Sequence, residues 1–264
     1  MAASEKKIGI TILGSGTSTG VPVIGCECHV CSSTDRRNRR SRSSILVSLD
    51  AGNILIDTST DLRYQALKNG IRKVDAVLFT HAHADHVHGI DELRSFNFIQ
   101  KGVIPCFGNA ITLHRIKKMF SYIFKDHNSG GGIPHLSMTE AAEKFSLLDE
   151  EIVPIEVIHG DLPILGYRIA DVAYITDCSE IQAASMEKLK RLDLLILGAL
   201  RYKTHNTHFT VDEALAVVNI LRPKRALFTH LGHDLDYERA SAALPENVGL
   251  AFDGMTLEFA YKSK

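Results

Sequence analysis

The sequence predicts an α/β fold in which two β-sheets pack face to face and helices cover their outer faces. Apolar runs of strand length alternate with segments of helical periodicity in both halves of the chain. No stretch rich in Pro, Gly or Ser divides the 264 residues, so one domain spanning residues 1–264 is expected.

The first half of the chain shows strand patterns bounded by turn signals. Asp50-Ala51-Gly52 lies between two apolar runs and predicts a hairpin. Thr60 or Asp61 can cap the helix that follows. The elements expected in this half are strands over 7–13, 45–49, 53–56, 74–79 and 103–107 and helices over 61–70, 89–99 and 110–124.

The second half repeats this alternation of strands and helices. His159, Asp177 and His230 each come directly after an expected strand. Strand ends of one sheet layer lie side by side, so these three side chains are expected to converge, although a lone histidine is more often an ordinary residue than a ligand. The elements expected here are strands over 151–158, 165–169, 172–176, 194–197 and 225–229 and a helix over 211–221.

The ten residues from Thr80 to Gly89 carry the strongest chemical signal. They follow the apolar run 74–79 and place four metal-binding side chains close together, namely His81, His83, Asp85 and His86. Imidazole and carboxylate groups are the ligands that divalent Zn, Mn or Fe prefer. A surface His-rich tract is the alternative, but the strand, the loop and the glycine together favour a defined metal site. His88 lies outside the spacing and is expected to pack or to support a ligand.

A second candidate metal site lies in a loop over about residues 21–42. Cys26, Cys28 and Cys31 fall within six residues of one another. Three thiolates at this spacing can converge on one tetrahedral zinc ion, but a closed structural site needs a fourth ligand. His29 is a weak candidate for that ligand, and three ordinary reduced cysteines are the alternative interpretation.

Three loop segments leave alternatives open. The run from Gly14 to Gly20 can contact a ligand through its backbone and hydroxyl groups, or it can be a plain connection. The loop 125–135 contains three consecutive glycines and suits a lid over the site, in which the roles of His127 and His135 stay open. A basic run can bind phosphate groups, although a solvated loop is favoured for most of its members, Arg36, Arg37, Arg39, Arg40 and Arg42.

Composition excludes several classes of protein. A hydrophobic content of 45% with 23% charged residues is typical of a globular protein in water. The formal net charge of -1 gives no global attraction to nucleic acid or to a membrane. No apolar run is long enough to span a bilayer, and the first residues lack the apolar core of a secretory signal, so a cytoplasmic location is expected. The five cysteines are therefore expected to be reduced.

The residues 81–86 match the signature His-x-His-x-Asp-His of the metallo-β-lactamase superfamily. Five more stretches accompany it in order: Gly14-Ser15-Gly16-Thr17-Ser18-Thr19-Gly20, Cys26-Glu27-Cys28-His29-Val30-Cys31, Ile175-Thr176-Asp177, Asn206-Thr207-His208-Phe209 and Thr229-His230-Leu231-Gly232-His233. With this ordered set the chain resembles the PhnP-type phosphodiesterases, which cleave cyclic phosphodiesters and are relatives of the tRNA-processing enzyme tRNase Z.

The resemblance implies the αββα sandwich of that superfamily, with two mixed sheets and outer helices. It also implies two divalent metal ions in the active site, Zn, Mn or Fe, and one structural Zn. One catalytic ion would be held by His81, His83 and His159, and the other by Asp85, His86 and His230, with Asp177 bridging the two. The structural Zn would be held by Cys26, Cys28, Cys31 and His233. Asp57 is implied as the acceptor that orients a metal-binding histidine.

The implied reaction is hydrolysis of a small phosphodiester or nucleotide, such as a phosphoribosyl 1,2-cyclic phosphate. A hydroxide held between the two ions would attack phosphorus. His208 is implied as the general acid for the leaving group, a role that suits a pKa near neutrality, and Asp85 is grouped with it as catalytic. His205 is the competing acid, and Asn206 stands where the family often has Pro. No membrane partner is expected, and a homodimer stays open.

Three other functions compete with this hypothesis. An RNA-processing nuclease of the tRNase Z type is less favoured, because the chain has no long basic insertion and is nearly neutral. A thioester hydrolase shares the ligand signature, but the cysteine cluster and His208 argue against it. A non-catalytic protein that binds nucleotides or metals would need no general acid, so the presence of His208 argues against that function too.

Overall fold

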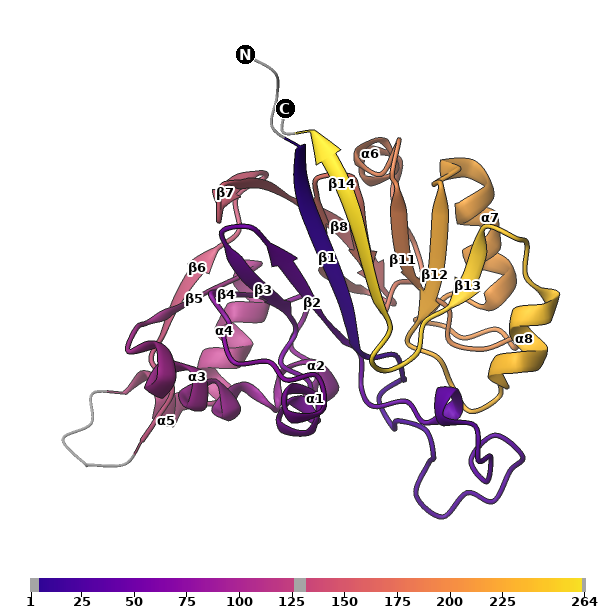
Figure 1. Ribbon diagram of the computed structural model, residues 1–264, viewed down its shortest axis with the longest axis horizontal. Helices are drawn as coiled ribbons and strands as arrows, with labels where there is room; N and C mark the ends of the chain where they lie inside the picture. The colour runs from indigo at the N-terminus through magenta and orange to yellow at the C-terminus, as the bar shows by residue number, and fades with distance from the viewer. Residues whose placement is uncertain (1–4, 126–131, 263–264) are drawn as a thin grey trace.

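The computed structural model describes residues 5–125 and 132–262 and contains two facing seven-stranded sheets (Figure 1). Helices pack on the outer face of each sheet, which confirms the predicted metallo-β-lactamase sandwich. The first sheet contains β1 (Glu5–Gly14), β2 (Ser44–Leu49), β3 (Gly52–Ile56), β4 (Ala76–Leu78), β5 (Ile104–Gly108), β6 (Leu136–Glu140) and β14 (Thr256–Lys262). The second contains β7 (Phe145–Leu147), β8 (Glu150–His159), β9 (Leu162–Ile169), β10 (Val172–Ile175), β11 (Leu194–Gly198), β12 (Arg225–Thr229) and β13 (Val248–Leu250).

The helices divide between the two outer faces in chain order. The first sheet carries α1 (Leu62–Lys68), α2 (Ala84–Val87), α3 (Leu93–Gln100), α4 (Ala110–Met119) and α5 (Ser121–Phe124) on its side of the molecule (Figure 1). The second carries α6 (Ala183–Lys188), α7 (Val211–Leu221) and α8 (Tyr237–Ala243). Two short 3-10 helices cover Arg36–Asn38 and Ile90–Glu92. No helix in the described ranges is long and apolar enough to cross a membrane.

Each sheet is mixed. The first has the order β14-β1-β2-β3-β4-β5-β6, in which β3 to β6 run parallel and the other pairs run antiparallel. The second has the order β13-β12-β11-β10-β9-β8-β7, in which β10 to β13 run parallel. Parallel strands end at the same edge of a sheet, so residues that follow them along the chain are brought together there.

Alternation along the central strands separates an inner core from two outer cores. In β11, Leu194 and Ile196 face the opposite sheet, whereas Leu195 and Leu197 face the helices. Because strands buried on both faces need apolar side chains at every position, this segment reads as the continuous apolar run seen in the sequence. The helix α7 buries one face that contains Val211, Ala214 and Val218.

Three polar residues that end strands adopt a left-handed backbone. Asp57 follows β3 with φ 63°, Asp177 lies two residues after β10 with φ 51°, and His230 follows β12 with φ 56°. Such a conformation is uncommon for residues other than glycine and persists only where the surroundings fix it, commonly at functional sites. The fold therefore turns three strand ends sharply at one place.

The structure differs from the predicted elements in three respects. The helix expected over 110–124 is broken at Phe120, where φ is -109° and ψ is 42°, into α4 and α5. Asp61 precedes α1 but forms no side-chain cap, because its carboxylate accepts hydrogen bonds from Arg42 instead. The elements β6, β7, β13, β14, α6 and α8 were not predicted, and Asp85 and His86 lie on the short helix α2 where a loop was expected.

Candidate metal centre

Histidine and aspartate side chains gather where β4, β8, β10 and β12 end. Their ligand atoms fall into groups that each lie within 4.8 Å: His81, His83 and His159 in one group, and Asp85, His86, Asp177 and His230 in another. The seven residues implied as ligands are thus brought together. His208 joins them, because it forms a third group with His159 and Asp177.

Asp177 lies between the two groups. Its Oδ1 is 3.3 Å from His86 Nε2, and its Oδ2 is 3.1 Å from His230 Nε2. The same Oδ2 is 3.9 Å from the Nε2 of His81, which belongs to the other group. Asp177 Oδ2 therefore lies near donor atoms of both groups, so this one carboxylate can serve both candidate metal sites.

Several of these atoms are buried without a hydrogen-bond partner among the residues described. They are His81 Nε2, Asp85 Oδ2, His86 Nε2 and both ring nitrogens of His230. Yet His86 Nε2 lies only 3.1 Å from Asp85 Oδ2, so the atoms approach one another without hydrogen-bond geometry. Two ligands of one zinc ion, each at about 2.1 Å, lie about 3.0–3.4 Å apart in octahedral to tetrahedral geometry. The donor set therefore fits divalent metal ions, since orphaned buried polar atoms are otherwise costly.

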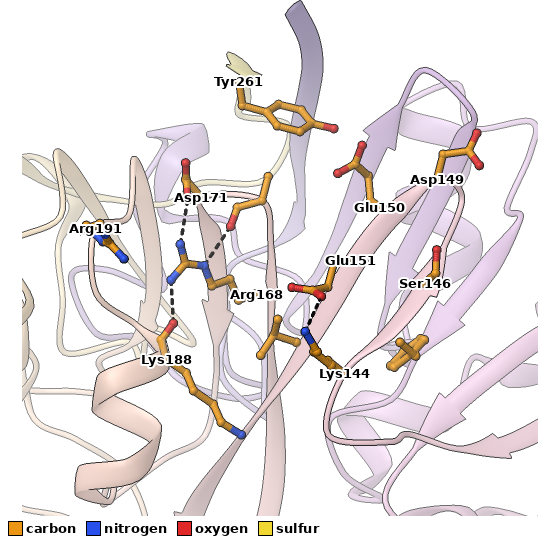
Figure 2. Close-up of a pocket in the computed structure, with 13 residues that line it drawn as sticks. Lys144, Ser146, Asp149, Glu150, Glu151, Arg168, Asp171, Lys188, Arg191 and Tyr261 are labelled. Carbon is orange, nitrogen blue, oxygen red and sulfur yellow. Dashed lines mark hydrogen bonds and ion pairs between the residues drawn. The ribbon is translucent and has the colours of Figure 1, made fainter. Parts of the chain in front are cut away.

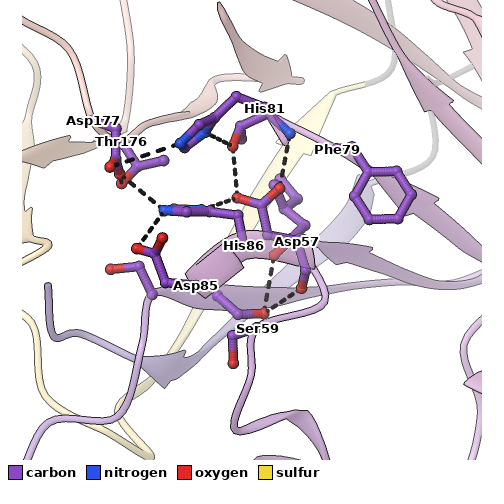
Figure 3. Close-up of polar contacts among 12 residues, drawn as sticks. Asp57, Ser59, Phe79, His81, Asp85, His86, Thr176 and Asp177 are labelled. Atoms are coloured by element: carbon purple, nitrogen blue, oxygen red, sulfur yellow. Dashed lines mark hydrogen bonds and ion pairs between the residues drawn. The ribbon is translucent and has the colours of Figure 1, made fainter. Parts of the chain in front are cut away.

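Asp57 contacts His86 and Thr80 on the side away from the other ligands. Its Oδ2 is 2.8 Å from His86 Nδ1 and accepts a hydrogen bond from Thr80 Oγ1 at 2.7 Å, while its Oδ1 accepts from the Thr80 amide at 2.8 Å. Figure 3 shows the His86 ring between Asp57 on one side and Asp85 and Asp177 on the other. With Nδ1 turned toward Asp57, Nε2 is the nitrogen left for a metal.

The opposite side of the cluster is held by a backbone carbonyl. His159 Nδ1 lies 2.8 Å from the carbonyl oxygen of Thr207, so His159 also presents Nε2 to the cluster. Gly160 has φ 64°, and a Cβ there would lie 2.8 Å from Thr207 Cγ2. Sequence reasoning gave no role to Thr80 or Thr207, although both stand beside predicted site residues in the quoted motifs.

The charges of the cluster act on one another. Burial lowers the pKa of His86, but the carboxylates of Asp177, Asp85 and Asp57 outweigh it and raise that pKa well above its usual value. Burial raises the pKa of Asp177, but His230 and His86 outweigh it and hold that pKa well below its usual value. Burial lowers the pKa of His81. Asp177 is therefore held ionised, the form in which a carboxylate binds metal.

His208 lies at the mouth of this cluster. Its ring stacks on that of His230 with centroids 4.9 Å apart, and its Nδ1 is 4.0 Å from Asp177 Oδ2. Burial and then the charge of His230 lower the pKa of His208 to about 3. This differs from the near-neutral pKa expected, because the ring is removed from water and surrounded by other histidines.

The Cys loop brings together the four residues implied as a structural zinc site. The His233 Nδ1 atom lies 3.3 Å from Cys26 Sγ, 3.6 Å from Cys28 Sγ and 3.5 Å from Cys31 Sγ. Bond lengths of about 2.3 Å to sulfur and 2.0–2.1 Å to nitrogen put S and N about 3.6 Å apart around a tetrahedral zinc ion. The geometry therefore fits zinc. The backbone amide of Cys31 lowers the pKa of Cys28 to about 6, which favours the thiolate.

The loop after β12 connects the two candidate sites, and a buried arginine holds it. Arg40 is 1% exposed, and its guanidinium donates to the carbonyls of Gly232 at 2.8 Å and Leu235 at 2.5 Å. Sequence reasoning favoured a solvated role for most of the basic run. Arg36 and Arg39 are exposed as expected, whereas Arg40 is buried. The periodicity of the sequence gives no sign of that burial.

Other predicted positions lie apart from the cluster. His88 is exposed and packs edge-on against Phe120 at 5.7 Å. His135 is exposed, and its carbonyl accepts hydrogen bonds from Ile104 and Asn97. His127 and most of the glycine loop predicted as a lid lie outside the described residues.

A cavity of about 680 Å³ lies at the other end of β8, beginning at Glu150, whereas His159 ends that strand at the cluster. Four of its charged side chains form two ion pairs, Lys144 with Glu151 at 3.0 Å and Arg168 with Asp171 at 2.7 Å (Figure 2). Among the described residues, the cavity brings together no group of metal-ligating side chains like the cluster at the other end of β8, so the cluster is the better candidate for chemistry.

Comparisons with known proteins agree with this geometry. Residues 52–231 match the family model described as Beta-lactamase superfamily domain. The chain is 42% identical to a solved diphosphatase of the PhnP family, with a TM-score of 0.92, and the match covers 98% of this chain and 100% of that one. The short form of human tRNase Z shares the fold, with a TM-score of 0.69 at 18% identity over 94% of this chain and 98% of that one.

A curated relative carries a different name. An octanoyltransferase of Porphyromonas gingivalis is 39% identical over 249 residues, which make up 92% of this chain and 50% of that protein. The chain thus spans about half the length of this curated relative.

Proposed function

The chain belongs to the β-lactamase superfamily and is PhnP-like, and on this premise we propose that it is a metal-dependent phosphodiesterase acting on a small cyclic phosphate or nucleotide. A phosphoribosyl 1,2-cyclic phosphate is the substrate type that the resemblance favours. One observation carries the proposal: Asp177 Oδ2 lies near His230 of its own group of donor atoms and near His81 of the other group, and several atoms of the two groups are buried with no hydrogen-bond partner among the described residues.

The residues that would hold two ions, Zn, Mn or Fe, are His81, His83 and His159 for one and Asp85, His86 and His230 for the other, with Asp177 shared. When bound, such a pair supplies an activated water near neutral pH and neutralises phosphate oxygens. The protein's own contribution is orientation. Asp57 turns the ring of His86, and the carbonyl of Thr207 turns the ring of His159, so both rings present Nε2.

His208 is proposed to hold the proton for the leaving alkoxide. Its pKa of about 3 makes the ring neutral in the free protein. A phosphate anion beside it favours the protonated form, because opposite charge raises the pKa of an imidazole. His230, whose ring stacks on that of His208 with centroids 4.9 Å apart, keeps the His208 ring at the mouth of the cluster.

A diphosphate bond is a second candidate for cleavage, because the PhnP-family protein of 42% identity is named a diphosphatase. Attack at phosphorus requires the same residues in both cases. RNA processing is less supported, since the tRNase Z likeness, at 18% identity, concerns the fold alone.

Acyl transfer is not proposed for this chain. Covalent acyl transfer needs an activated nucleophile such as a reactive thiolate. Cys26, Cys28 and Cys31 converge on His233, and burial raises the pKa of Cys106 and Cys178 well above the usual value. The octanoyltransferase relative is also twice as long as the part that matches.

The experiment is a parallel turnover assay of the metal-loaded protein. The substrates are bis-p-nitrophenyl phosphate, a phosphoribosyl 1,2-cyclic phosphate, a nucleoside diphosphate ester, a thioester and a tRNA precursor. Fastest turnover of the cyclic phosphate is expected. Turnover of the thioester or of the tRNA precursor alone would contradict the proposal. Turnover of the diphosphate ester alone would mean that the protein cleaves a diphosphate bond and not a cyclic phosphodiester.

A further inference from the structure

A half-buried histidine outside both ligand groups lies beside His208. His205 stands in the loop between β11 and α7, and its ring centroid is 5.0 Å from that of His208. We propose that His205 Nε2–H donates a hydrogen bond to a non-bridging oxygen of the substrate phosphate. This inference rests on the proposed phosphodiesterase function and adds a substrate-binding residue to it.

The tautomer of His205 follows from its contacts with Thr207. The Thr207 amide donates to His205 Nδ1 at 3.3 Å, and Thr207 Oγ1 lies 3.2 Å from the same nitrogen. A nitrogen that accepts from an amide carries no proton, so in the neutral ring the proton lies on Nε2. Nε2 forms no hydrogen bond with any described residue, and it is therefore a donor available to a ligand.

The ring lies close to the metal-ligand cluster, because it is beside His208, which forms a group with His159 and Asp177. Burial, followed by the charges of Arg201, His159 and His230, lowers the pKa of His205, which favours the neutral ring. His159 also lies against His208, with ring centroids 4.7 Å apart. The rings of His205 and His159 thus both lie beside the ring of His208 at the mouth of the cluster.

Thr207 contacts both His159 and His205. Its carbonyl oxygen lies 2.8 Å from His159 Nδ1. Its amide donates a hydrogen bond to His205 Nδ1, and its hydroxyl contacts the same nitrogen. One residue therefore sets the donor direction of His205 relative to a proposed metal ligand. Such fixed donors stabilise the charge that builds up on phosphate oxygens during attack, without rearranging during the reaction.

A donor to a non-bridging oxygen differs measurably from a general acid. Its contribution does not depend on the leaving group, because it bonds to an oxygen that stays on phosphorus. A neutral donor at the same place can also replace it. The side-chain amide of glutamine can occupy the position of an imidazole Nε2–H, so His205→Gln should retain much of the function that His205→Ala loses.

The test compares His205→Ala, His205→Gln and the control His114→Ala, which removes an exposed histidine on α4. Loss of a preorganised donor costs about a hundredfold to a thousandfold in a buried site, so a loss of about tenfold to a hundredfold in kcat/KM is expected at this half-buried one. The loss should be equal for p-nitrophenyl and poor leaving groups. Binding of inorganic phosphate to each metal-loaded protein, measured by calorimetry, should weaken about tenfold in His205→Ala and recover in His205→Gln.

The outcomes separate this inference from the proposed function. If the wild-type protein hydrolyses no phosphodiester or diphosphate, the proposed function fails, and weaker phosphate binding by His205→Ala alone would still support the donor role. Unchanged phosphate affinity together with unchanged turnover in His205→Ala would overturn the inference. A loss confined to poor leaving groups would also overturn it, because His205 would then be a proton donor.

Discussion

Asp57 and His86 form a fully buried pair in which Asp57 Oδ2 lies 2.8 Å from His86 Nδ1. The same carboxylate accepts hydrogen bonds from the amide and hydroxyl of Thr80. Asp57, at the end of β3, thereby holds both Thr80 and His86 of the ligand segment. The orientation of the His86 ring thus depends on a residue that is remote from it in sequence.

Asp57→Asn should weaken binding of the catalytic metals about tenfold to a hundredfold, because the amide of nearly the same shape loses the charge that orients His86. Competition with a chromogenic chelator measures this affinity. Asp75→Asn is the matched control, since Asp75 accepts from the Asn53 amide at the other end of β4. Equal affinity in Asp57→Asn and the wild type would contradict the assignment.

Mild chelation should abolish hydrolysis before it removes the last zinc. The catalytic site is open and rich in nitrogen and oxygen ligands, whereas three soft thiolates and His233 should hold zinc more tightly. Activity and zinc content are followed together during dialysis against a chelator. Complete loss of zinc while activity persists would reverse the assignment of the two sites.

Cys28→Ser should lower the melting temperature and the zinc content more than it changes the chemistry of correctly folded protein. Binding energy at a structural zinc site is folding energy, so the loss of one ligand weakens the whole site. Cys106→Ala is the control, because it removes a buried thiol on β5 that is absent from the candidate site. That variant should lose stability and keep its zinc. An unchanged melting temperature and zinc content in Cys28→Ser would exclude a structural zinc role.

His208→Ala should slow substrates with poor leaving groups far more than p-nitrophenyl esters. Loss of general acid catalysis costs about a hundredfold to ten-thousandfold, and p-nitrophenolate needs little protonation to leave. Metal content should stay unchanged. Equal slowing of both substrates with both metals bound would mean that His208 positions the phosphate, and loss of a metal would mean that it is a ligand.

Arg40→Met should destabilise the loop between His230 and His233. The variant leaves the carbonyls of Gly232 and Leu235 buried without their donor, at about 1–3 kcal/mol for each unsatisfied group. Arg39→Met, at an exposed neighbouring position, should be neutral. Denaturant unfolding measures the difference, and equal midpoints would show that the loop is held by other contacts.

The sequence predicted the parts of the fold that depend on local pattern. The helix over 211–221 and the strand over 225–229 match the structure residue for residue, because apolar periodicity and the helix-ending Pro223 act locally. The edge strands β13 and β14 were missed, since β14 is exposed along much of one face and its pairing with β1 spans nearly the whole chain.

The candidate site was predictable where a motif concentrates ligand types, as at His81 to His86, and where strand ends carry single residues such as Asp177. Its supporting contacts were not. Thr207 acts through backbone atoms, which any residue possesses, and Arg40 is buried by contacts with a loop almost 200 residues away. Neither role leaves a pattern in the amino-acid types.

The pairing of β1 with β14 places Glu5 opposite Lys262, and the two described ends of the chain leave the sandwich side by side (Figure 1). β1 then runs ten residues, about 30 Å, before reaching the Gly14 loop that pairs with Leu231 beside His230. A second protein module attached at either end would therefore emerge at the pole opposite the metal ligands. Such an architecture tolerates gene fusion and circular permutation, because neither joins the chain near the reaction centre.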